Sequence, residues 1–422
     1  MSYVVQAKNG AELNRLYEED LLIHDWYRFV LSYPPHLVQS YLRRFDIGVK
    51  KCVLDPFCGT GTTLVECKKY GISSVGIEAN PVVHLMAETK TRWDVDATAL
   101  INHADTIAKE AFLRVKKHGG NLKTLTEEQH DLIIKDSISP VPLHKALILL
   151  EVMDEFHDAR FINYEKTAFA KQLVFAFSNL KFGPEVGVNK KKKADVDVID
   201  IWLEQVKEMA ENMAFFGRRK NASSIVHLAD SRDVGITLQP NSIDAVITSP
   251  PYPNEKDYSR TTRLESVLLG FISSKKDLRA HKERLLRSNT RNVYASDTDE
   301  KWIANNGRVL ELAASIERKR IELEKNSGFE KLYHRVVKLY FGGMARHLEE
   351  LKPKLRSGAK LAYVVGDQAS YFRILIQTGE ILADIARNLG YDVLNIDLFR
   401  TRLSTATKDR LREEVVLLQW KG

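Results

Sequence analysis

The chain has 422 residues, of which 28% are charged and 44% are hydrophobic, and its formal net charge is +7. This length predicts about two or three domains, and the apolar content excludes a chain that is disordered throughout. Three cysteines are too few for a disulfide scaffold, no apolar run could cross a membrane, and the polar N-terminus is not a signal peptide. We therefore expect a cytoplasmic protein without a membrane partner, and its charge favours a polyanionic partner.

The first ordered pattern alternates strand, glycine-rich turn, helix and strand. The strands are expected at 52–54 and 74–77, and the helix between them at 62–70. The turn is the segment Asp55–Thr63, with the sequence DPFCGTGTT, and the second strand ends at Glu78. Asn80 and Pro81 are typical of the start of another helix. This succession predicts a doubly wound α/β sheet.

Two long segments interrupt the α/β pattern. The first, 94–219, is mostly helical, and a Gly/Pro loop is expected within it at 182–194. The second, 255–327, is polar, basic and partly helical. Further strands are expected at 224–228, 243–247, 360–365, 393–398 and 414–420, with helices at 329–351 and 374–388. We therefore predict one Rossmann-like domain of six or seven strands with two insertions, divided as 1–94, 95–221, 222–258, 259–328 and 329–422.

The glycine-rich turn and the acid after the second strand predict a nucleoside site. Gly59 and Gly61 allow a tight turn that can approach a ligand closely, and Glu78 can accept hydrogen bonds from both ribose hydroxyls. The turn lacks the Walker A pattern and a third glycine at the dinucleotide spacing. Asp55 would repel a pyrophosphate, but it could hold a cationic ligand or a main-chain turn. These features suit S-adenosylmethionine, which carries an amino group, a sulfonium and no phosphate.

Three segments resemble motifs of the DNA amino-methyltransferase family. They are DPFCGTGT from Asp55, GIEANP from Gly76, and TSPPY from Thr248. The segment His24–Phe45, with Tyr-Pro-Pro from Tyr33, resembles the family motif that covers the methionine part of the cofactor. The resemblance covers residues 20–94, 222–258 and 330–420, but neither insertion. It implies a class I methyltransferase sheet, doubly wound and mostly parallel, with one antiparallel C-terminal strand. The cofactor residues that it implies are Tyr33, Pro34, Asp55, Pro56, Phe57, Gly59, Thr60, Gly61, Thr62, Glu78, Asn80 and Asp230, the last near the adenine amino group.

The segment Ser249-Pro250-Pro251-Tyr252 carries the expected catalytic residues. Two prolines after a buried strand stiffen the backbone, so that the Ser249 hydroxyl and the Pro250 carbonyl can hold the two N–H groups of an exocyclic amine. The lone pair of the amine nitrogen would then face the sulfonium methyl group. Tyr252 offers an aromatic face to a base that has left the duplex.

The serine at position 249 directs the choice of base. In the resembling family, SPPY more often accompanies methylation of cytosine N4, and DPPY that of adenine N6, so cytosine N4 is the first expectation and adenine N6 the alternative. Methylation of cytosine C5 requires a thiolate nucleophile, usually in a Pro-Cys dipeptide, which is absent here. An RNA or protein amino-methyltransferase, and a non-catalytic nucleic-acid-binding protein, remain the other interpretations. The histidines and cysteines lack metal-ligand spacing, so no metal is expected.

Two basic runs are candidates for binding double-stranded DNA. The segment Lys275–Arg291 holds seven basic residues and two acidic ones, and a second run lies in the first insertion. A charge run can also be only a solvated face, but beside a base-modifying site it favours phosphate binding. The candidates are Lys190, Lys191, Lys192, Lys193, Lys275, Lys276, Arg279, Arg287 and Arg291. Either insertion could recognise the target, and a restriction endonuclease acting on the same site is the expected partner.

Overall fold

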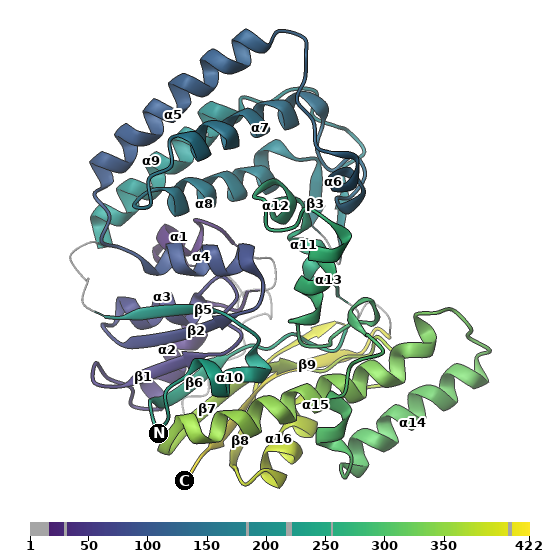
Figure 1. Cartoon of the computed structure of the whole chain (residues 1–422). Coiled ribbons are helices and arrows are strands. Elements are labelled where there is room, and N and C mark those ends of the chain that lie inside the picture. Colours follow the sequence, from purple (N-terminus) through teal and green to yellow (C-terminus); the bar gives the residue numbers. More distant parts are fainter. Residues whose placement is uncertain (1–16, 29–31, 183–184, 217–221, 255, 404–406) are drawn as a thin grey trace.

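Among the residues that the structure describes, the main sheet has seven strands in the order β5-β2-β1-β6-β7-β9-β8 (Figure 1). The computed structural model describes residues 17–28, 32–182, 185–216, 222–254, 256–403 and 407–422. The strands of the main sheet are β1 (Cys52–Asp55), β2 (Ser73–Glu78), β5 (Ser224–Leu228), β6 (Ile243–Thr248), β7 (Leu355–Gly366), β8 (Asp392–Leu403) and β9 (Arg410–Gln419). Strand β9 runs antiparallel to its neighbours β7 and β8, whereas the other neighbouring pairs are parallel. The predicted Rossmann-like sheet with one antiparallel C-terminal strand is confirmed.

Helices cover both faces of this sheet because alternate residues of its strands point to opposite faces and both sets are apolar. Val53 and Ile247 pack on the side of α2 and α3, whereas their neighbours Leu54 and Val246 pack on the side of α15 and α16. The helices around the sheet are α1 (Glu18–His24), α2 (Pro35–Arg44), α3 (Thr62–Lys69), α4 (Pro81–Thr91), α10 (Val234–Thr237), α15 (Tyr333–Leu351) and α16 (Thr378–Asn388). Burial on both faces explains why the strands read as apolar runs.

Strands β8 and β9 extend well beyond the short apolar runs that predicted them. Their outer ends pair Arg400 with Glu413 and Leu403 with Arg410, and the Arg400 guanidinium lies 2.5 Å from the Glu413 carboxylate. These ends are rich in charged residues, so hydrophobicity along the sequence did not reveal them. The extension carries Phe399, Arg400, Arg402 and Leu403 to the ligand cleft described below.

The first insertion forms a helical layer above the sheet, as seen in Figure 1. Its elements are α5 (Ala97–His118), α6 (Glu127–Leu132), α7 (Pro140–Glu155), α8 (Ile162–Gln172), the π-helix η2 (Leu173–Phe177) and α9 (Val198–Phe216). Leu149, Phe169 and Trp202 belong to a buried core that these helices share. The loop expected at 182–194 is in part a hairpin, because β3 (Leu180–Phe182) and β4 (Val186–Val188) pair antiparallel. Three-residue strands are too short to show a periodic pattern.

The second insertion packs against two different cores. Its elements are α11 (Tyr258–Thr261), α12 (Arg263–Leu268), α13 (Lys275–Glu283), the short 3-10 helices η4 (Thr290–Asn292) and η5 (Asp299–Ile303), and α14 (Gly307–Glu322). Leu264 and Val267 of α12 join the core of the helical insertion. Leu286, Ile303 and Val309 instead join the core beneath the sheet. The segment therefore bridges the helical layer and the sheet. Within the described part of the chain, no helix combines the length and the apolar character of a membrane span.

Candidate active site

The residues that follow the carboxyl ends of β1, β2, β5 and β6 surround a cleft of about 600 Å³. Parallel strands place these ends at one edge of the sheet, where the strand order reverses and ligands bind in such folds. Of the residues expected from the sequence, the cleft is lined by Tyr33, Pro34, Phe57, Gly59, Thr60, Thr62, Glu78, Asn80, Asp230, Ser249, Pro250, Pro251 and Tyr252. The structure thus brings the glycine-rich turn and the TSPPY segment to one cavity.

Asp55, at the end of β1, is buried behind the wall of the cleft. Its Oδ1 accepts hydrogen bonds from the Thr248 hydroxyl (2.6 Å) and the Phe57 amide (3.2 Å), and its Oδ2 accepts one from the Tyr33 hydroxyl (2.9 Å). Burial raises the pKa of this carboxyl to about 6, although the hydrogen bonds lower it. Of the two roles expected for Asp55, the structure favours that of holding a main-chain turn, and it joins this turn to the strand that leads into Ser249.

The glycine-rich turn needs glycine at two positions because its backbone enters the left-handed region. The φ angle is 51° at Gly59 and 84° at Gly61, values that L side chains rarely adopt. A Cβ atom at Gly61 would lie 3.3 Å from Ala87 of α4, so the turn packs closely against that helix. Gly61 and Pro56 shape the turn without belonging to the residues that line the cleft.

Glu78 connects the end of β2 to this turn. Its Oε2 accepts a hydrogen bond from the Gly59 amide (3.0 Å), and its Oε1 accepts one from the Asn80 amide (2.8 Å). Burial raises the pKa of the Glu78 carboxyl to about 7, with both backbone hydrogen bonds opposing the shift. The Asn80 side chain caps α4 as expected, since it accepts a hydrogen bond from the Val82 amide (3.1 Å). Glu78 also lines the cleft, so its remaining lone pairs can accept hydrogen bonds from a ligand.

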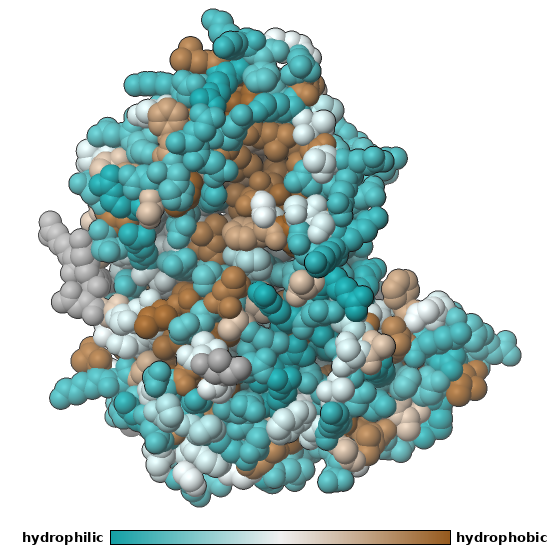
Figure 2. Space-filling view, viewed as in Figure 1, coloured by the Kyte–Doolittle hydropathy of each residue, from teal (hydrophilic) through white to brown (hydrophobic). Residues whose placement is uncertain are grey.

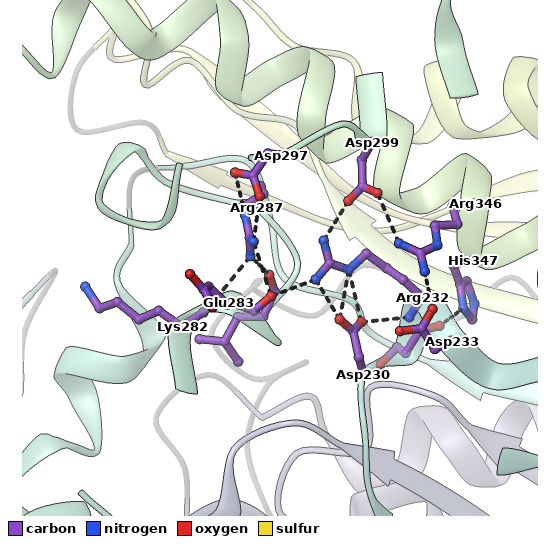
Figure 3. Close-up of polar contacts among 12 residues, drawn as sticks. Asp230, Arg232, Asp233, Lys282, Glu283, Arg287, Asp297, Asp299, Arg346 and His347 are labelled. Carbon is purple, nitrogen blue, oxygen red and sulfur yellow. Dashed lines mark hydrogen bonds and ion pairs between the residues drawn. The ribbon is translucent and has the colours of Figure 1, made fainter. Parts of the chain in front are cut away.

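Asp230 follows β5 and lines the cleft beside a buried arginine (Figure 3). The Arg232 Nη2 lies 2.6 Å from the Asp230 Oδ2, and the Arg232 Nε lies 3.0 Å from the Oδ1. The Asp230 Oδ1 also accepts a hydrogen bond from the Arg232 amide (2.9 Å), and this bond caps the short helix η3 (Ser231–Asp233). These contacts hold the carboxylate in one orientation at the cleft wall.

The Ser249–Tyr252 segment is held by β7. The Ser249 hydroxyl donates a hydrogen bond to the Val364 carbonyl (3.1 Å), so its lone pairs remain able to accept. A Cβ atom at Gly366 would lie 2.9 Å from the Tyr252 ring, so the ring packs directly on the backbone of this strand. Burial raises the pKa of the Tyr252 phenol, which therefore stays neutral.

Comparisons with known proteins support the resemblance to DNA methyltransferases. Residues 24–89 match the N6_N4_Mtase family model, described as DNA methylase. The chain is 23% identical to Type II methyltransferase M.BsoBI from Geobacillus stearothermophilus, in a match that covers 92% of this chain and 82% of that protein. It is 24% identical to Type II methyltransferase M.AvaI from Nostoc sp., over 88% of this chain and 79% of that protein. In these matches the chain resembles the DNA amino-methyltransferase family.

Two further matches are more limited. Type II methyltransferase M.MjaII from Methanocaldococcus jannaschii is 41% identical over 75 residues, which are 17% of this chain and 14% of that protein. Among solved structures, TrmN from Thermus thermophilus overlaps 94% of this chain and 52% of its own, with 10% identity and a TM-score of 0.29. The resemblance to DNA methyltransferases therefore rests on the sequence matches.

The cleft is also lined by residues that the sequence analysis did not single out as site residues. They are Ser231, Lys256, Tyr258, Arg284, Leu285, Leu286, Ser288, Asn292, Gln368, Ser370, Arg400, Arg402 and Glu413. Tyr258 could have been suspected as a second aromatic residue near the catalytic segment, and Arg284 lies within the basic run already noted. Arg400 and Arg402 gave no signal because only the pairing of β8 with β9 brings them to the cleft.

The basic residues predicted to bind DNA fall into three groups. The first group is exposed and consists of Lys190, Lys191, Lys192, Lys275, Lys276, Arg279 and Arg291. Within it, Lys275 pairs with Asp131 (3.4 Å) and Arg279 pairs with Glu283 (3.0 Å). Lys193 is partly buried and donates to the Ala176 carbonyl. The prediction for Arg287 was wrong, since its side chain is 3% exposed and pairs with Asp297 at 2.7 Å. A one-letter basic pattern cannot distinguish a solvent-facing arginine from one that holds a loop together.

Apolar surface also gathers on the helical insertion. Figure 2 shows the largest continuous hydrophobic area of that view over the helices above the sheet, whereas the surface below is mostly hydrophilic. Exposed apolar side chains of this insertion include Phe112, Leu113, Phe156, Phe175 and Phe215.

One group of possible metal ligands occurs among the described residues, formed by Asp20, His24 and Glu66. The ammonium group of Lys69 lies 2.8 Å from the Glu66 carboxylate and 3.5 Å from that of Asp20. The His24 ring also lies 2.8 Å from Glu66. Because a lysine already balances these carboxylates, we interpret the group as a buried ion-pair network that joins α1 to α3.

Proposed function

We propose that this protein methylates the N4 atom of cytosine in double-stranded DNA, with S-adenosylmethionine as donor, as the modification enzyme of a restriction–modification pair. The observation that carries the proposal is the shared cleft of the glycine-rich turn, Glu78 and the Ser249–Tyr252 segment. The similarity to proteins named Type II methyltransferases supports DNA as the substrate and a restriction endonuclease as the partner. Methylation of adenine N6 is the alternative.

The cofactor end of the cleft suits a nucleoside that carries positive charge rather than phosphate. Carboxylates of Glu78 and Asp230 stand in the lining, and the Gly59 amide, which could bind a phosphate oxygen, already donates to Glu78. Phe57 and Pro34 add apolar surface beside them. Glu78 would accept hydrogen bonds from the ribose, and Asp230 would accept one from the adenine amino group. When bound, S-adenosylmethionine supplies the electrophilic methyl group.

The catalytic end of the cleft provides acceptors for an amine. The Ser249 hydroxyl oxygen and the Pro250 carbonyl can each accept one N–H of the cytosine amino group, which would turn the nitrogen lone pair out of the ring plane. Thr248 bonds to the buried Asp55 carboxylate and Ser249 bonds to Val364, so the start of this short segment is fixed. Fixed acceptors require little reorganisation during the reaction, and this lowers the barrier.

Two tyrosines and two cations complete the target end. Tyr252 and Tyr258 both line the cleft, and the aromatic face of each can stack on an extrahelical base. Lys256 and Arg284 line it as well, and neither has an ion-pair partner among the described residues. A basic side chain beside the site that receives the base can bind the phosphates of the same strand.

The test is transfer of labelled methyl groups to unmodified duplex DNA, followed by digestion to nucleosides and mass spectrometry. N4-methylcytosine supports the proposal, and N6-methyladenine supports the alternative base. Label on RNA or protein instead of DNA would refute the DNA assignment. A variant with Ser249→Ala should bind S-adenosylmethionine normally and lose methyl transfer, whereas Glu311→Gln, on the exposed face of α14, should behave like the wild type.

A further inference from the structure

We propose that Arg232 is a positioning residue that couples the cofactor end of the cleft to the second insertion, so that cofactor and DNA strengthen each other's binding. The inference rests on the proposed function, since it takes the cleft as the cofactor site and the insertion as a DNA contact. Such coupling requires a physical connection between the two sites that each ligand can bias. The network in Figure 3, centred on the buried Arg232, supplies that connection.

The Arg232 side chain is buried and uses all three of its nitrogens. Its Nε and Nη2 hold Asp230 at the cleft wall. Its Nη1 donates to the Asp299 Oδ2 (2.6 Å), and its Nη2 also donates to the Glu283 carbonyl (2.9 Å). Asp230 belongs to the sheet domain, whereas Glu283 and Asp299 belong to the second insertion. One guanidinium group therefore joins the two parts.

Helix α15 anchors the far side of this network. The Arg346 Nη1 lies 3.4 Å from the Asp299 Oδ1, and the Arg346 Nη2 pairs with Asp233, which follows Arg232 directly. A Cβ atom at Gly342 would lie 2.0 Å from the Asp299 carbonyl oxygen, so the backbone of the insertion rests directly on the helix. Asp299 is thus held by two arginines, and its position is set by close packing as well as by charge.

The segment that Arg232 holds continues into the wall of the cleft. Arg284, Leu285 and Leu286 come directly after Glu283 and line the cleft, as do Ser288 and Asn292 of the same segment. The wall is tied at its base by a second buried arginine in this segment, because the Arg287 Nη2 donates to the same Glu283 carbonyl (3.2 Å). Two buried arginines therefore hold the backbone at the point where this wall begins.

Charge balance makes the two ends of the network interdependent. A buried guanidinium is stable only while it is paired, and here it is shared between two carboxylates. A ligand that fixes Asp230 also favours the Arg232 orientation that holds Asp299 and the Glu283 carbonyl. DNA that contacts Arg284 favours the same arrangement from the other side. By linkage, each ligand must raise the affinity for the other by the same factor.

The test uses Asp299→Asn, which keeps the size of the side chain and removes its charge. Asp299 is not among the residues that line the cleft. We would measure the Kd of S-adenosylmethionine by calorimetry, with and without saturating unmethylated plasmid DNA. In the wild type, DNA should lower this Kd by about fivefold or more, whereas in the variant the effect should shrink to less than about twofold. Glu311→Gln, whose carboxylate pairs with Arg318 on the surface of the same insertion, should retain the wild-type factor.

A second readout separates coupling from general damage. Amide hydrogen exchange over residues 283–292 should slow when cofactor binds the wild type, but not when it binds Asp299→Asn. If that variant does not fold, Arg346→Gln removes the other partner of Asp299 without touching Asp230, and it should reduce the coupling in the same direction. The inference is overturned if the variant keeps the wild-type fold change in the Kd of S-adenosylmethionine caused by DNA. It is also overturned if DNA does not change this Kd in the wild type. A wild type that binds no S-adenosylmethionine refutes the proposed function itself.

Discussion

Replacing Gly366 with alanine tests whether the position of the Tyr252 ring controls methyl transfer. The added Cβ would lie 2.9 Å from the ring atom Cε2 and 3.3 Å from the Cγ of Glu413. Carbon atoms in contact prefer a separation of about 3.5–4.0 Å, so the ring must move by about 0.5–1 Å. A misplacement of about 1 Å can cost about 100-fold in rate. We therefore expect kcat to fall by about 10- to 100-fold.

The assay compares kcat for methyl transfer with the Kd of S-adenosylmethionine. The Kd should change little, because Gly366 does not belong to the residues around the glycine-rich turn. Overpacking should also cost about 1–3 kcal/mol of unfolding free energy, measured by urea titration. Gly307→Ala is the matched control, since a Cβ there would meet no atom within 4 Å. A Gly366→Ala enzyme that folds normally and keeps the wild-type kcat would refute the reasoning.

Three further predictions concern the cofactor, the DNA and the pH dependence of stability. Glu78→Gln should weaken S-adenosylmethionine binding by about 10- to 100-fold, while DNA affinity stays constant. Because burial raises the pKa of Glu78 to about 7, the cofactor affinity of the wild type should decrease when the pH is lowered below 7. Equal loss of both affinities would indicate misfolding. Lys256→Gln and Arg284→Gln should each reduce the slope of log Kd for DNA against log salt by about one, whereas Lys50→Gln, at the opposite edge of the sheet, should not; unchanged slopes would remove both residues from the DNA contact. Burial lowers the pKa of His347 from 6.5 to about 4, so the unfolded chain binds a proton first on acidification. Between pH 6.5 and 4 the wild type should lose about 3 kcal/mol more stability than His347→Gln, and parallel curves in urea titrations would contradict this assignment.

The cofactor half of the site was accessible from the sequence because its motifs are local. A strand, a left-handed turn at Gly59 and Gly61, a helix and an acid at the next strand end require specific residue types within a short stretch. The structure agrees with the expected elements there, including the Asn80 cap. Asp55 shows the limit of local reading, since its carboxylate accepts a hydrogen bond from Thr248, a residue distant in the sequence.

The far wall of the cleft could not be predicted in the same way. Lys256, Arg284 and Arg402 reach it because insertion segments and an antiparallel strand pair return to the sheet edge. Residue type alone also misassigned Arg287, which is buried against backbone carbonyls and Asp297 instead of facing solvent. Whether an arginine binds DNA or holds a loop depends on which groups surround it.

The order of residues in this chain was sufficient to predict the α/β class, the glycine-rich turn and the grouping of Ser249–Tyr252 with a nucleoside site. The physical reason is that backbone geometry, apolar burial and turn chemistry are set by neighbours along the sequence. Tertiary structure alone decided that Arg232 joins Asp230 to Asp299, because these carboxylates come from separate parts of the chain. A buried charge is stabilised by the partners that the fold brings close to it, and these partners cannot be predicted from their separation along the sequence.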